Sequence, residues 1–317
     1  MRICVIFNPA AGRRRARRRL AGFLARWGDR VTLRPTARPG HAAELAAAAV
    51  REGFETIAAA GGDGTVHEVA DGLLRAADQT AGQATDQGES GAAPVFAVVP
   101  IGSANDYAHS LQRQFGTAPL DAPEAHPVDV GRLSWTAADG APRDRYFVCC
   151  CGAGLPGRVT LESRKIGWLQ GVPLYGLAAL RALRAAGPPE EWTVQYDDEP
   201  PTTGPTQSVH ALLGRREGGF LLAPDARLDD GLFDTLRLGP ASRWGMLKLL
   251  PGLARRGPPT DHPHVELGRR RSIQIDSPSP LAVHADGELA LIPADAVRSV
   301  RLDLLPGRLR AKVCAVG

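Results

Sequence analysis

The chain has 317 residues, of which 44% are hydrophobic and 23% are charged, a composition typical of globular proteins and not of disordered ones. This length exceeds what one compact core usually holds, so we expect two domains. The five cysteines include three adjacent ones, Cys149, Cys150 and Cys151, and form no C-x-x-C pair; this argues against a disulfide framework and a zinc site and favours a reducing, cytoplasmic location. No apolar segment is long enough to be expected to span a bilayer, so any membrane contact is expected to be peripheral.

The net charge is +4, but the basic residues are concentrated near the start of the chain. Residues 1–40 contain eleven arginines and a single acidic residue, Asp29, and six of the arginines lie within Arg13–Arg19. Such a segment attracts phosphate groups or an anionic membrane surface, and it is equally compatible with a solvated helix face. Because aromatic residues make up only 5% and do not alternate with basic ones, we do not expect a nucleic acid partner.

The first part of the chain alternates between expected strands and helices. Strands are expected at 3–7, 31–34, 56–60 and 95–100, and helices at 13–27, 41–53, 66–77 and 105–111. This order predicts an α/β domain built on a doubly wound parallel sheet. Residues 78–93 are polar and rich in Gly, Gln and Ala, which is typical of a surface insertion, and we assign them no function.

After about Pro127 the pattern becomes rich in strands. Strands are expected at 128–133, 145–151, 192–196, 209–213, 233–238, 272–276 and 300–304, and helices at 174–186 and 244–254. This predicts a β-rich, mainly antiparallel second domain. Trp244 and the leucines near it are flanked by Arg and Lys, so this segment fits either a membrane interface or a core helix, whereas core packing is the better interpretation of 174–184.

The sequence Ala60–Glu68 (AGGDGTVHE) follows an expected buried strand and opens a helix. Its three glycines allow a sharp turn and a close approach to a ligand, and the free N–H groups at a helix N-terminus favour an anion. Asp63 would repel a bare phosphate, but it fits if Mg²⁺ or a hydroxyl group lies between them. The alternative is a tight strand–helix turn in which Asp63 is the N-cap.

Two similar loops follow other expected strands of the same sheet. They are Asn8–Gly12 (NPAAG) and Pro100–Ala108 (PIGSANDYA). In open α/β sheets, ligands bind outside the carboxyl ends of the strands. We therefore expect the three loops to converge on one crevice.

The ordered set N-P-x-x-G, G-G-D-G-T and P-x-G-[ST]-x-N-D-x-A resembles the diacylglycerol kinase catalytic family, which includes soluble bacterial diacylglycerol kinases, YegS-like lipid kinases, and sphingosine and ceramide kinases. Pro224–Leu232 resembles the P-x-A-x-x-D-D-G-x segment of that family, and Asp286–Glu288 resembles its D-G-E segment. Taken singly, these two segments fit an ordinary β-turn and a hairpin turn. The resemblance covers most of the chain.

The resemblance implies an ATP-dependent lipid kinase that transfers the γ-phosphate of Mg-ATP to a diacylglycerol-like or sphingoid-like hydroxyl. An NAD kinase, which shares G-G-D-G-T, and a non-catalytic nucleotide- or lipid-binding regulator are the alternatives. It also implies a nucleotide-binding kinase domain at 1–127, to which 303–317 can return, and a lipid-substrate domain at 128–302. The partners are ATP and a lipid presented at the inner face of the membrane, and the oligomeric state, a dimer included, is left open.

The same resemblance assigns roles to individual residues. Nucleotide contacts fall on Asn8, Pro9, Gly12, Thr36, Gly61, Gly62, Asp63, Gly64, Thr65, His67, Ser103, Asn105 and Asp106. A Mg²⁺ ion is expected at Asp230, with the backbone carbonyls of Arg227 and Leu232. Glu288 is the first choice for the catalytic base and Asp286 the second, and Asp63 is assigned to the catalytic group as well.

Overall fold

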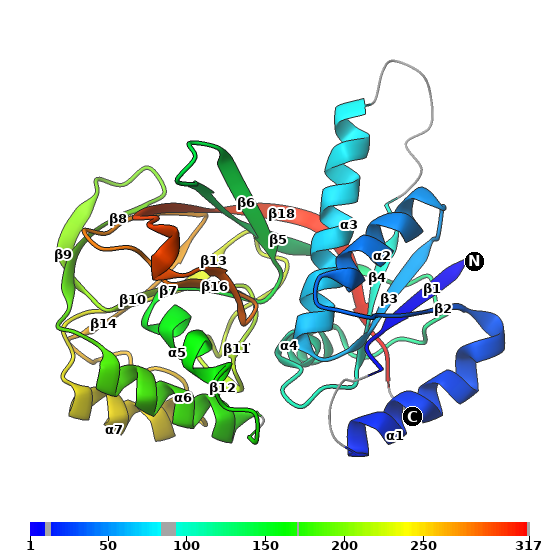
Figure 1. Ribbon diagram of the computed structural model, residues 1–317, viewed down its shortest axis with the longest axis horizontal. Helices are drawn as coiled ribbons and strands as arrows, with labels where there is room; N and C mark the ends of the chain where they lie inside the picture. Colours follow the sequence, from blue (N-terminus) through cyan, green and yellow to red (C-terminus); the bar gives the residue numbers. More distant parts are fainter. Residues whose placement is uncertain (10–13, 84–92, 170, 316–317) are drawn as a thin grey trace. The chain divides into compact units, whose positions relative to one another are not determined.

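The computed structural model describes residues 1–9, 14–83, 93–169 and 171–315 (Figure 1). It divides into two compact units, which we describe separately. The first comprises Met1–Val128 and Gly307–Gly317, and the second comprises Asp129–Pro306. The chain therefore leaves the first unit once and returns to it at the end.

The first unit is built on a parallel sheet in the order β2 (Thr32–Pro35), β1 (Ile3–Phe7), β3 (Thr56–Gly61) and β4 (Val95–Pro100). The last residues of β18 (Ser299–Val313) pair with β4, also in parallel. Every residue of β3 is buried, which is expected of a parallel strand covered on both faces.

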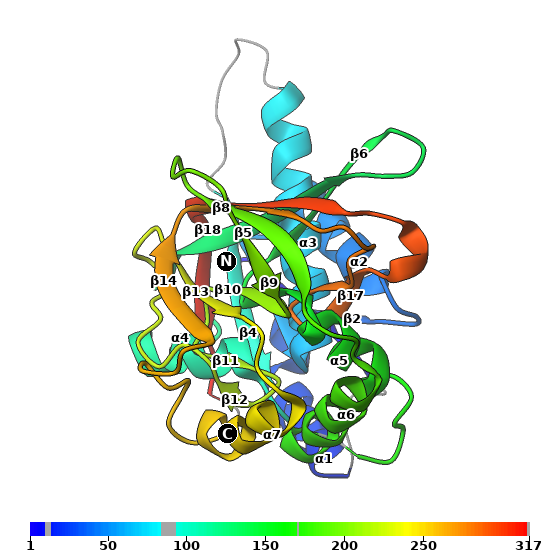
Figure 2. The same ribbon diagram turned by 90° about the vertical axis from the view of Figure 1, so that its left-hand side faces the viewer.

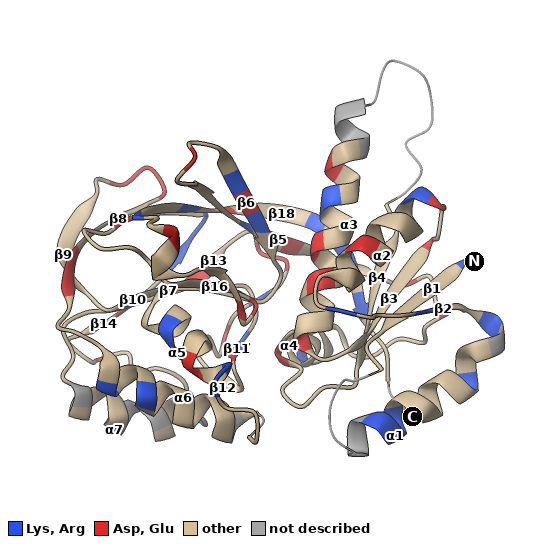
Figure 3. Ribbon diagram, viewed as in Figure 1, with Lys and Arg blue, Asp and Glu red and all other residues tan. Residues whose placement is uncertain are grey.

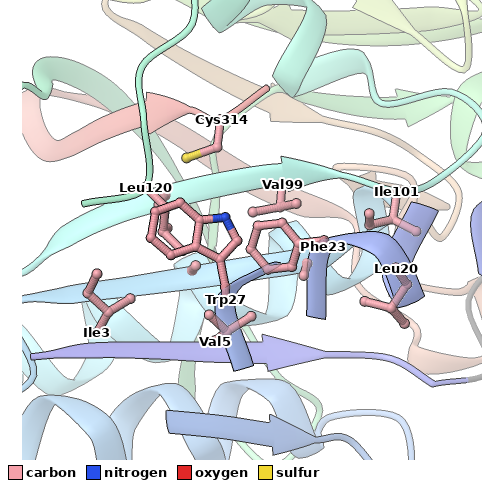
Figure 4. Packing of buried hydrophobic residues seen from close by; sticks show 12 residues of the cluster. Ile3, Val5, Leu20, Phe23, Trp27, Val99, Ile101, Leu120 and Cys314 are labelled. Atoms are coloured by element: carbon pink, nitrogen blue, oxygen red, sulfur yellow. The ribbon is translucent and has the colours of Figure 1, made fainter. Parts of the chain in front are cut away.

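Helices cover both faces of this sheet. On one face α1 (Arg14–Trp27) places Phe23 and Trp27 against Val5 of β1 and Val99 of β4 (Figure 4). On the other face lie α2 (His41–Arg51), α3 (Asp63–Gln83) and α4 (Asp106–Phe115), which contact β1, β3 and β4. A short 3₁₀ helix, η1 (Gly28–Arg30), follows α1. The doubly wound arrangement predicted from the sequence is confirmed.

The third helix differs from its prediction at both ends. It begins at Asp63, directly in the glycine-rich loop, and runs to Gln83, so the first residues of the expected 78–93 insertion are helical. Alanine and glutamine are good helix formers, and one interruption by glycine does not end the helix. The remainder of that insertion, 84–92, lies outside the described residues.

The second unit contains a six-stranded antiparallel sheet. Its order is β14 (Val265–Arg270), β13 (Phe233–Leu238), β10 (Ser208–Leu212), β7 (Cys150–Gly154), β16 (Val283–Ala285) and β17 (Glu288–Leu291). The other strands are β5 (His126–Thr136), β6 (Pro142–Phe147), β8 (Glu190–Tyr196), β9 (Thr202–Thr206), β15 (Ser272–Asp276) and the first part of β18. A separate hairpin is formed by β11 (Arg216–Glu217) and β12 (Phe220–Leu221).

Three helices, α5 (Leu155–Ser163), α6 (Val172–Ala185) and α7 (Arg243–Leu253), accompany these sheets (Figure 2). Leu183 of α6 and Met246 of α7 belong to one buried cluster with Leu236 and Leu238 of β13. A 3₁₀ helix, η2 (Pro293–Asp295), precedes β18. Among the helices of the described residues, none combines the length and apolarity needed to cross a membrane.

One expected strand, 145–151, is two strands, because the chain breaks its ladder at Val148 and Cys149. The backbone N–H groups of these two residues donate to the Asp286 carboxylate instead of to a neighbouring strand. All five cysteines are buried. Burial raises the pKa of the Cys4 and Cys314 thiols to about 11.

Candidate active site

Two of the glycine-containing loops form a single surface at the carboxyl edge of the parallel sheet. The N–H groups of Ile101 and Gly102 both donate to the carbonyl oxygen of Gly61, at 2.9 and 3.0 Å. A Cβ atom on Gly102 would lie 2.5 Å from the Cα atom of Gly62. Only glycine permits this approach of one backbone to the other, so the G-G-D-G-T and P-x-G-[ST]-x-N-D segments are packed together.

The Asp63 carboxylate joins the same two loops. Its Oδ2 accepts the N–H of Asn105 and its Oδ1 accepts the N–H of Asp106, both at 2.8 Å. Asn105 is in the left-handed region, with φ +54°, and its side-chain amide donates to the carbonyl of Gly102 at 2.9 Å. Asp63 is thus the first residue of its own helix and caps the start of α4, which corrects the alternative reading of this residue as the N-cap of α3.

The remaining residues predicted to contact the nucleotide differ in their burial. Asn8 follows β1 and Thr36 follows β2, and the N–H of Thr36 donates to the carbonyl of Phe7 at 2.9 Å, so both lie at the same sheet edge as the glycine loops. Gly12 lies outside the described residues. The other predicted contacts range from exposed to buried: Pro9 and Ser103 are exposed, Gly62, Asp63, Gly64 and Asn105 are half-buried, and Thr65, His67, Asp106 and Gly61 are buried. The side chain of His67, 2% exposed, presents almost no surface to a ligand.

Glu68 is the last residue of the Ala60–Glu68 segment, and the sequence analysis gave it no role. Its two carboxylate oxygens accept the N–H groups of Gly40 at 2.8 Å and Ala42 at 3.1 Å, at the start of α2. The motif therefore supplies a helix cap to α2 as well as to α4. No signal in the sequence connects Glu68 with residues that precede it by more than 25 positions.

In the second unit, Asp286 and Gly287 form the turn between β16 and β17. Both have positive φ, +51° and +80°, as the tight hairpin turn expected for Asp-Gly requires. The Asp286 carboxylate accepts the N–H groups of Val148, Cys149 and Cys150 at 2.8–2.9 Å. A carboxylate that accepts several backbone hydrogen bonds is stabilised in its ionised form and is a weak proton acceptor.

Glu288, the other carboxylate of this turn, has a different environment. Its side chain is 39% exposed and forms an ion pair with Arg164 at 2.6 Å. Because its one ion pair lies at the surface, where such pairs are weak, Glu288 can turn toward a ligand. The structure thus separates the two residues that the sequence offered as alternatives for the base.

The loop expected to bind Mg²⁺ contains oxygen donors of the kind that Mg²⁺ prefers. Asp230 supplies the one carboxylate predicted to bind the ion, and this carboxylate already has partners. Its Oδ1 accepts the N–H of Leu232 at 3.1 Å, and its Oδ2 pairs with the Arg269 guanidinium. In the described part of the chain, no three His, Cys, Asp or Glu side chains gather in a way that could hold a metal ion. A cation at Asp230 would therefore have to replace Arg269.

Asp129 was missed by the sequence analysis and supports this loop from inside the unit. It is 2% exposed, its Oδ2 accepts the N–H of Gly231 at 2.7 Å, and its own N–H donates to the carbonyl of Leu228 at 2.7 Å. The only sequence signal was an acidic residue between two valines of an expected strand.

Comparison with known protein families covers both units. Residues 2–133 match the family described as "Diacylglycerol kinase catalytic domain", and residues 149–312 match "YegS C-terminal NAD kinase beta sandwich-like domain". The chain belongs to the diacylglycerol kinase catalytic family of the YegS type. This family membership makes the chain a kinase and confirms the resemblance on which the sequence analysis relied.

Relatives with assigned names are similar along almost their whole length. The diacylglycerol kinase of Staphylococcus saprophyticus subsp. saprophyticus is 27% identical over 291 residues, which is 90% of this chain and 88% of that protein. The diacylglycerol kinase of Bacillus subtilis is 26% identical over 308 residues, covering 94% and 93%.

Solved structures show the same fold at lower identity. A crystal structure of a diacylglycerol kinase from Bacillus anthracis str. Sterne has a TM-score of 0.63 at 18% identity and covers 98% of this chain and 96% of its own. Yeast NADH kinase, solved with NADH, has a TM-score of 0.52 at 10% identity, with coverages of 99% and 83%. The predicted fold class, a parallel α/β part followed by a β-rich antiparallel part, is confirmed.

Proposed function

We propose that the chain transfers the γ-phosphate of ATP to the hydroxyl group of a lipid, which is diacylglycerol-like or sphingoid-like. The observation that carries this proposal is the packed surface of Gly61–Asp63 and Gly102–Asp106 at the carboxyl edge of a parallel sheet, in a member of this kinase family. The names of the relatives favour a diacylglycerol-like acceptor.

The first unit would bind the nucleotide. The backbone of the glycine-rich loop and the N-terminus of α3 would face the phosphates, and Asn8, Thr36 and Ser103 at the same edge would add polar contacts. A divalent metal, when bound, supplies the charge that neutralises the transferred phosphate. Asp63, a carboxylate in the glycine-rich loop itself, is the group of this surface that would share it. Asp230, with the carbonyls of Arg227 and Leu232, remains a proposed Mg²⁺ site that requires Arg269 to move.

Glu288 would act on the acceptor. The lipid hydroxyl oxygen forms a bond with the γ-phosphorus, the bond to the oxygen that bridges the β- and γ-phosphates breaks, and the hydroxyl proton passes to Glu288. The pair of electrons from the broken bond leaves with ADP. Asp286 is poorly suited to this role because three backbone N–H groups bind its carboxylate.

One face of the second unit suits a lipid surface. On α7, Trp244 is 76% exposed and Lys248, one turn further on, is exposed as well, while Met246 is buried. On α6, Leu180, Arg181 and Arg184 are exposed. The basic positions of α6 are the blue bands on this helix in Figure 3. Aromatic and basic side chains side by side are typical of interfacial helices, and each basic residue contributes about 1 kcal/mol near an anionic membrane. We infer peripheral contact with the inner face of the membrane through these helices.

The test is transfer of labelled γ-phosphate from Mg-ATP to a panel of lipids in mixed micelles, with NAD offered separately as an acceptor. We expect a labelled lipid, and a loss of about 100-fold or more in kcat for Glu288→Gln, since a general base typically contributes this much. Glu44→Gln, which removes an exposed carboxylate on α2, serves as the matched control and should leave kcat unchanged.

Two results would contradict the proposal. Labelled NADP without labelled lipid would identify an NAD kinase. Binding of ATP without transfer to any acceptor would identify a nucleotide-binding regulator.

A further inference from the structure

Three ionisable side chains that the proposed mechanism does not use meet inside the second unit. The Glu217 carboxylate lies between two imidazole rings, with its Oε2 atom 2.9 Å from Nδ1 of His210 and its Oε1 atom 3.0 Å from Nε2 of His284. The side chains of His210, Glu217 and His284 are 10%, 15% and 1% exposed. Burial alone would raise the pKa of Glu217, but the two imidazole rings hold it well below its ordinary value. The group is therefore a fully partnered buried carboxylate.

The register of the antiparallel sheet creates this arrangement. His210 of β10 and His284 of β16 both pair with Gly152 of β7, the strand between them. Residues that pair across antiparallel strands project on the same face, so the two rings stand in one row with a glycine between them. A Cβ atom on Gly152 would lie 2.7 Å from Nε2 of His284. The absence of a side chain at Gly152 therefore leaves room for the His284 ring and for Pro156. The Glu217 carboxylate comes from the β11–β12 hairpin.

His284 connects this cluster to the turn that carries Glu288. Its Nδ1 atom accepts the N–H of Gly287 at 3.2 Å. An imidazole nitrogen that accepts a hydrogen bond carries no proton, so the ring proton of neutral His284 is on Nε2 and points at Glu217. If the proton were on Nδ1 instead, the N–H of Gly287 and the Nδ1–H of His284 would face each other, and the hydrogen bond between them would be lost.

We propose that Glu217 is a positioning residue that acts through His284 to hold the Asp286–Glu288 turn in the conformation that presents Glu288. The inference rests on the proposed function, in which Glu288 receives the acceptor proton. Glu217 does not touch the turn itself; it fixes which nitrogen of His284 is protonated. The Asp286 carboxylate anchors one residue of the turn, and the His284 bond anchors Gly287, the residue that directly precedes Glu288.

Two substitutions of His284 distinguish its contact with Gly287 from its contact with Glu217. In His284→Asn the side-chain oxygen can replace Nδ1 as the acceptor for Gly287, but the side chain is too short to reach Glu217. In His284→Gln the amide can reach Glu217 in place of Nε2 but offers no acceptor at the Nδ1 position. We expect His284→Gln to lower kcat about tenfold or more, the scale of loss for a misplaced reacting group, and His284→Asn to stay close to the wild type.

The role of Glu217 is tested by combining it with His284. Glu217→Ala should lower kcat about tenfold with an unchanged KM for ATP, and it should add almost nothing in the His284→Asn background, because the asparagine acceptor does not depend on a tautomer. His210→Asn is the matched control: it keeps an N–H group for Glu217, loses only the contact with Ser208, and should leave kcat unchanged. All values refer to folded enzyme, with the folded fraction measured for each variant.

A second measurement does not depend on activity. Hydrogen exchange of the Gly287 amide should become faster in Glu217→Ala and in His284→Gln, and should change little in His210→Asn. The inference is overturned if Glu217→Ala lowers stability but leaves kcat and Gly287 exchange unchanged, or if its effect is equal in the wild-type and His284→Asn backgrounds. Failure of the proposed function is distinguishable, because Glu288→Gln would then retain activity while the exchange result still stands.

Discussion

The Asp63 carboxylate holds together two loops that are more than 40 residues apart in the chain, through the N–H groups of Asn105 and Asp106. In Asp63→Asn the charge is lost, and the amide NH₂ group must face one of these two N–H groups. Hydrogen bonds to charged groups contribute about 1.5–3 kcal/mol, so we expect the free energy of unfolding to fall by about that amount. Urea denaturation measures it directly.

The matched control for Asp63→Asn is Glu44→Gln, which also converts a carboxylate to an amide. Glu44 pairs with Arg38 at the surface, with side chains 57% and 59% exposed. Exposed pairs contribute between about 0 and 1 kcal/mol, so this change should have little effect on stability. Equal losses of stability in the two variants would show that the Asp63 cap does not stabilise the loop pair.

For single residues, the sequence indicated which ones belong to the site but not which groups they bind. Asp63, Asp286 and Glu288 were found because they lie in short motifs, which can be recognised from the sequence alone. The N–H groups of Val148 and Cys149, which bind Asp286 from more than 130 residues away, have no side-chain signature at all. Asp129 and the His210–Glu217–His284 cluster were missed for the same reason, because strand register brings them together.

Helices α2 and α3 are in close backbone contact at Gly72. A Cβ atom at this position would lie 2.3 Å from the carbonyl oxygen of Ala43, in the backbone of α2. Gly72→Ala should therefore lower the free energy of unfolding by about 1–3 kcal/mol, although alanine is the better helix former, because the two helices must separate. Urea denaturation of the purified variant tests this.

Gly22→Ala on α1 provides the matched control. Gly22 is exposed, and a Cβ atom there would meet no other atom within 4 Å. Without a clash, the same substitution should raise stability by about 0.5–1 kcal/mol. If both alanine variants were more stable than the wild type, the close packing of α2 against α3 would be refuted.

Among the elements, those with long apolar runs were predicted well. The buried strands β1, β3 and β4 are continuous apolar runs, and the structure confirms them and the helices between them. The strands β11, β12, β16 and β17 have two to four residues, too few for alternation to appear. The helix α5 was missed because its start follows directly from a strand, at Gly154–Leu155, with no polar residue between them.

For the whole molecule, the return of the chain to the first unit is the feature that local patterns describe least well. Residues 2–133 match one family, whereas the compact unit also contains Gly307–Gly317. The returning segment pairs Ala311, Lys312 and Val313 with β4, and Cys314 joins the buried cluster that contains Trp27 (Figure 4). The first unit is therefore not one continuous piece of sequence.

Lys312 shows how firmly this segment is held. It is 3% exposed, and its ammonium group donates to the carbonyl of Leu120 at 3.0 Å and to that of Ala122. Burial lowers the pKa of Lys312, since it disfavours the charged form, and the two carbonyl oxygens replace the water that burial removes. A buried, satisfied lysine at the end of a strand is a contact that a surface tail would not form.

Removal of residues 307–317 should consequently destabilise the first unit. Without them β4 becomes an edge strand with unpaired backbone groups, and the cluster around Trp27 loses Cys314. Hydrogen exchange measured by mass spectrometry should show faster exchange of Val95–Pro100 in the shortened chain. Peptides from β7 and β10 serve as an internal reference, because those strands pair only within the second unit. Unchanged exchange in β4 would mean that the parallel sheet is complete without its last strand, and that the unit is stable as the continuous segment Met1–Val128.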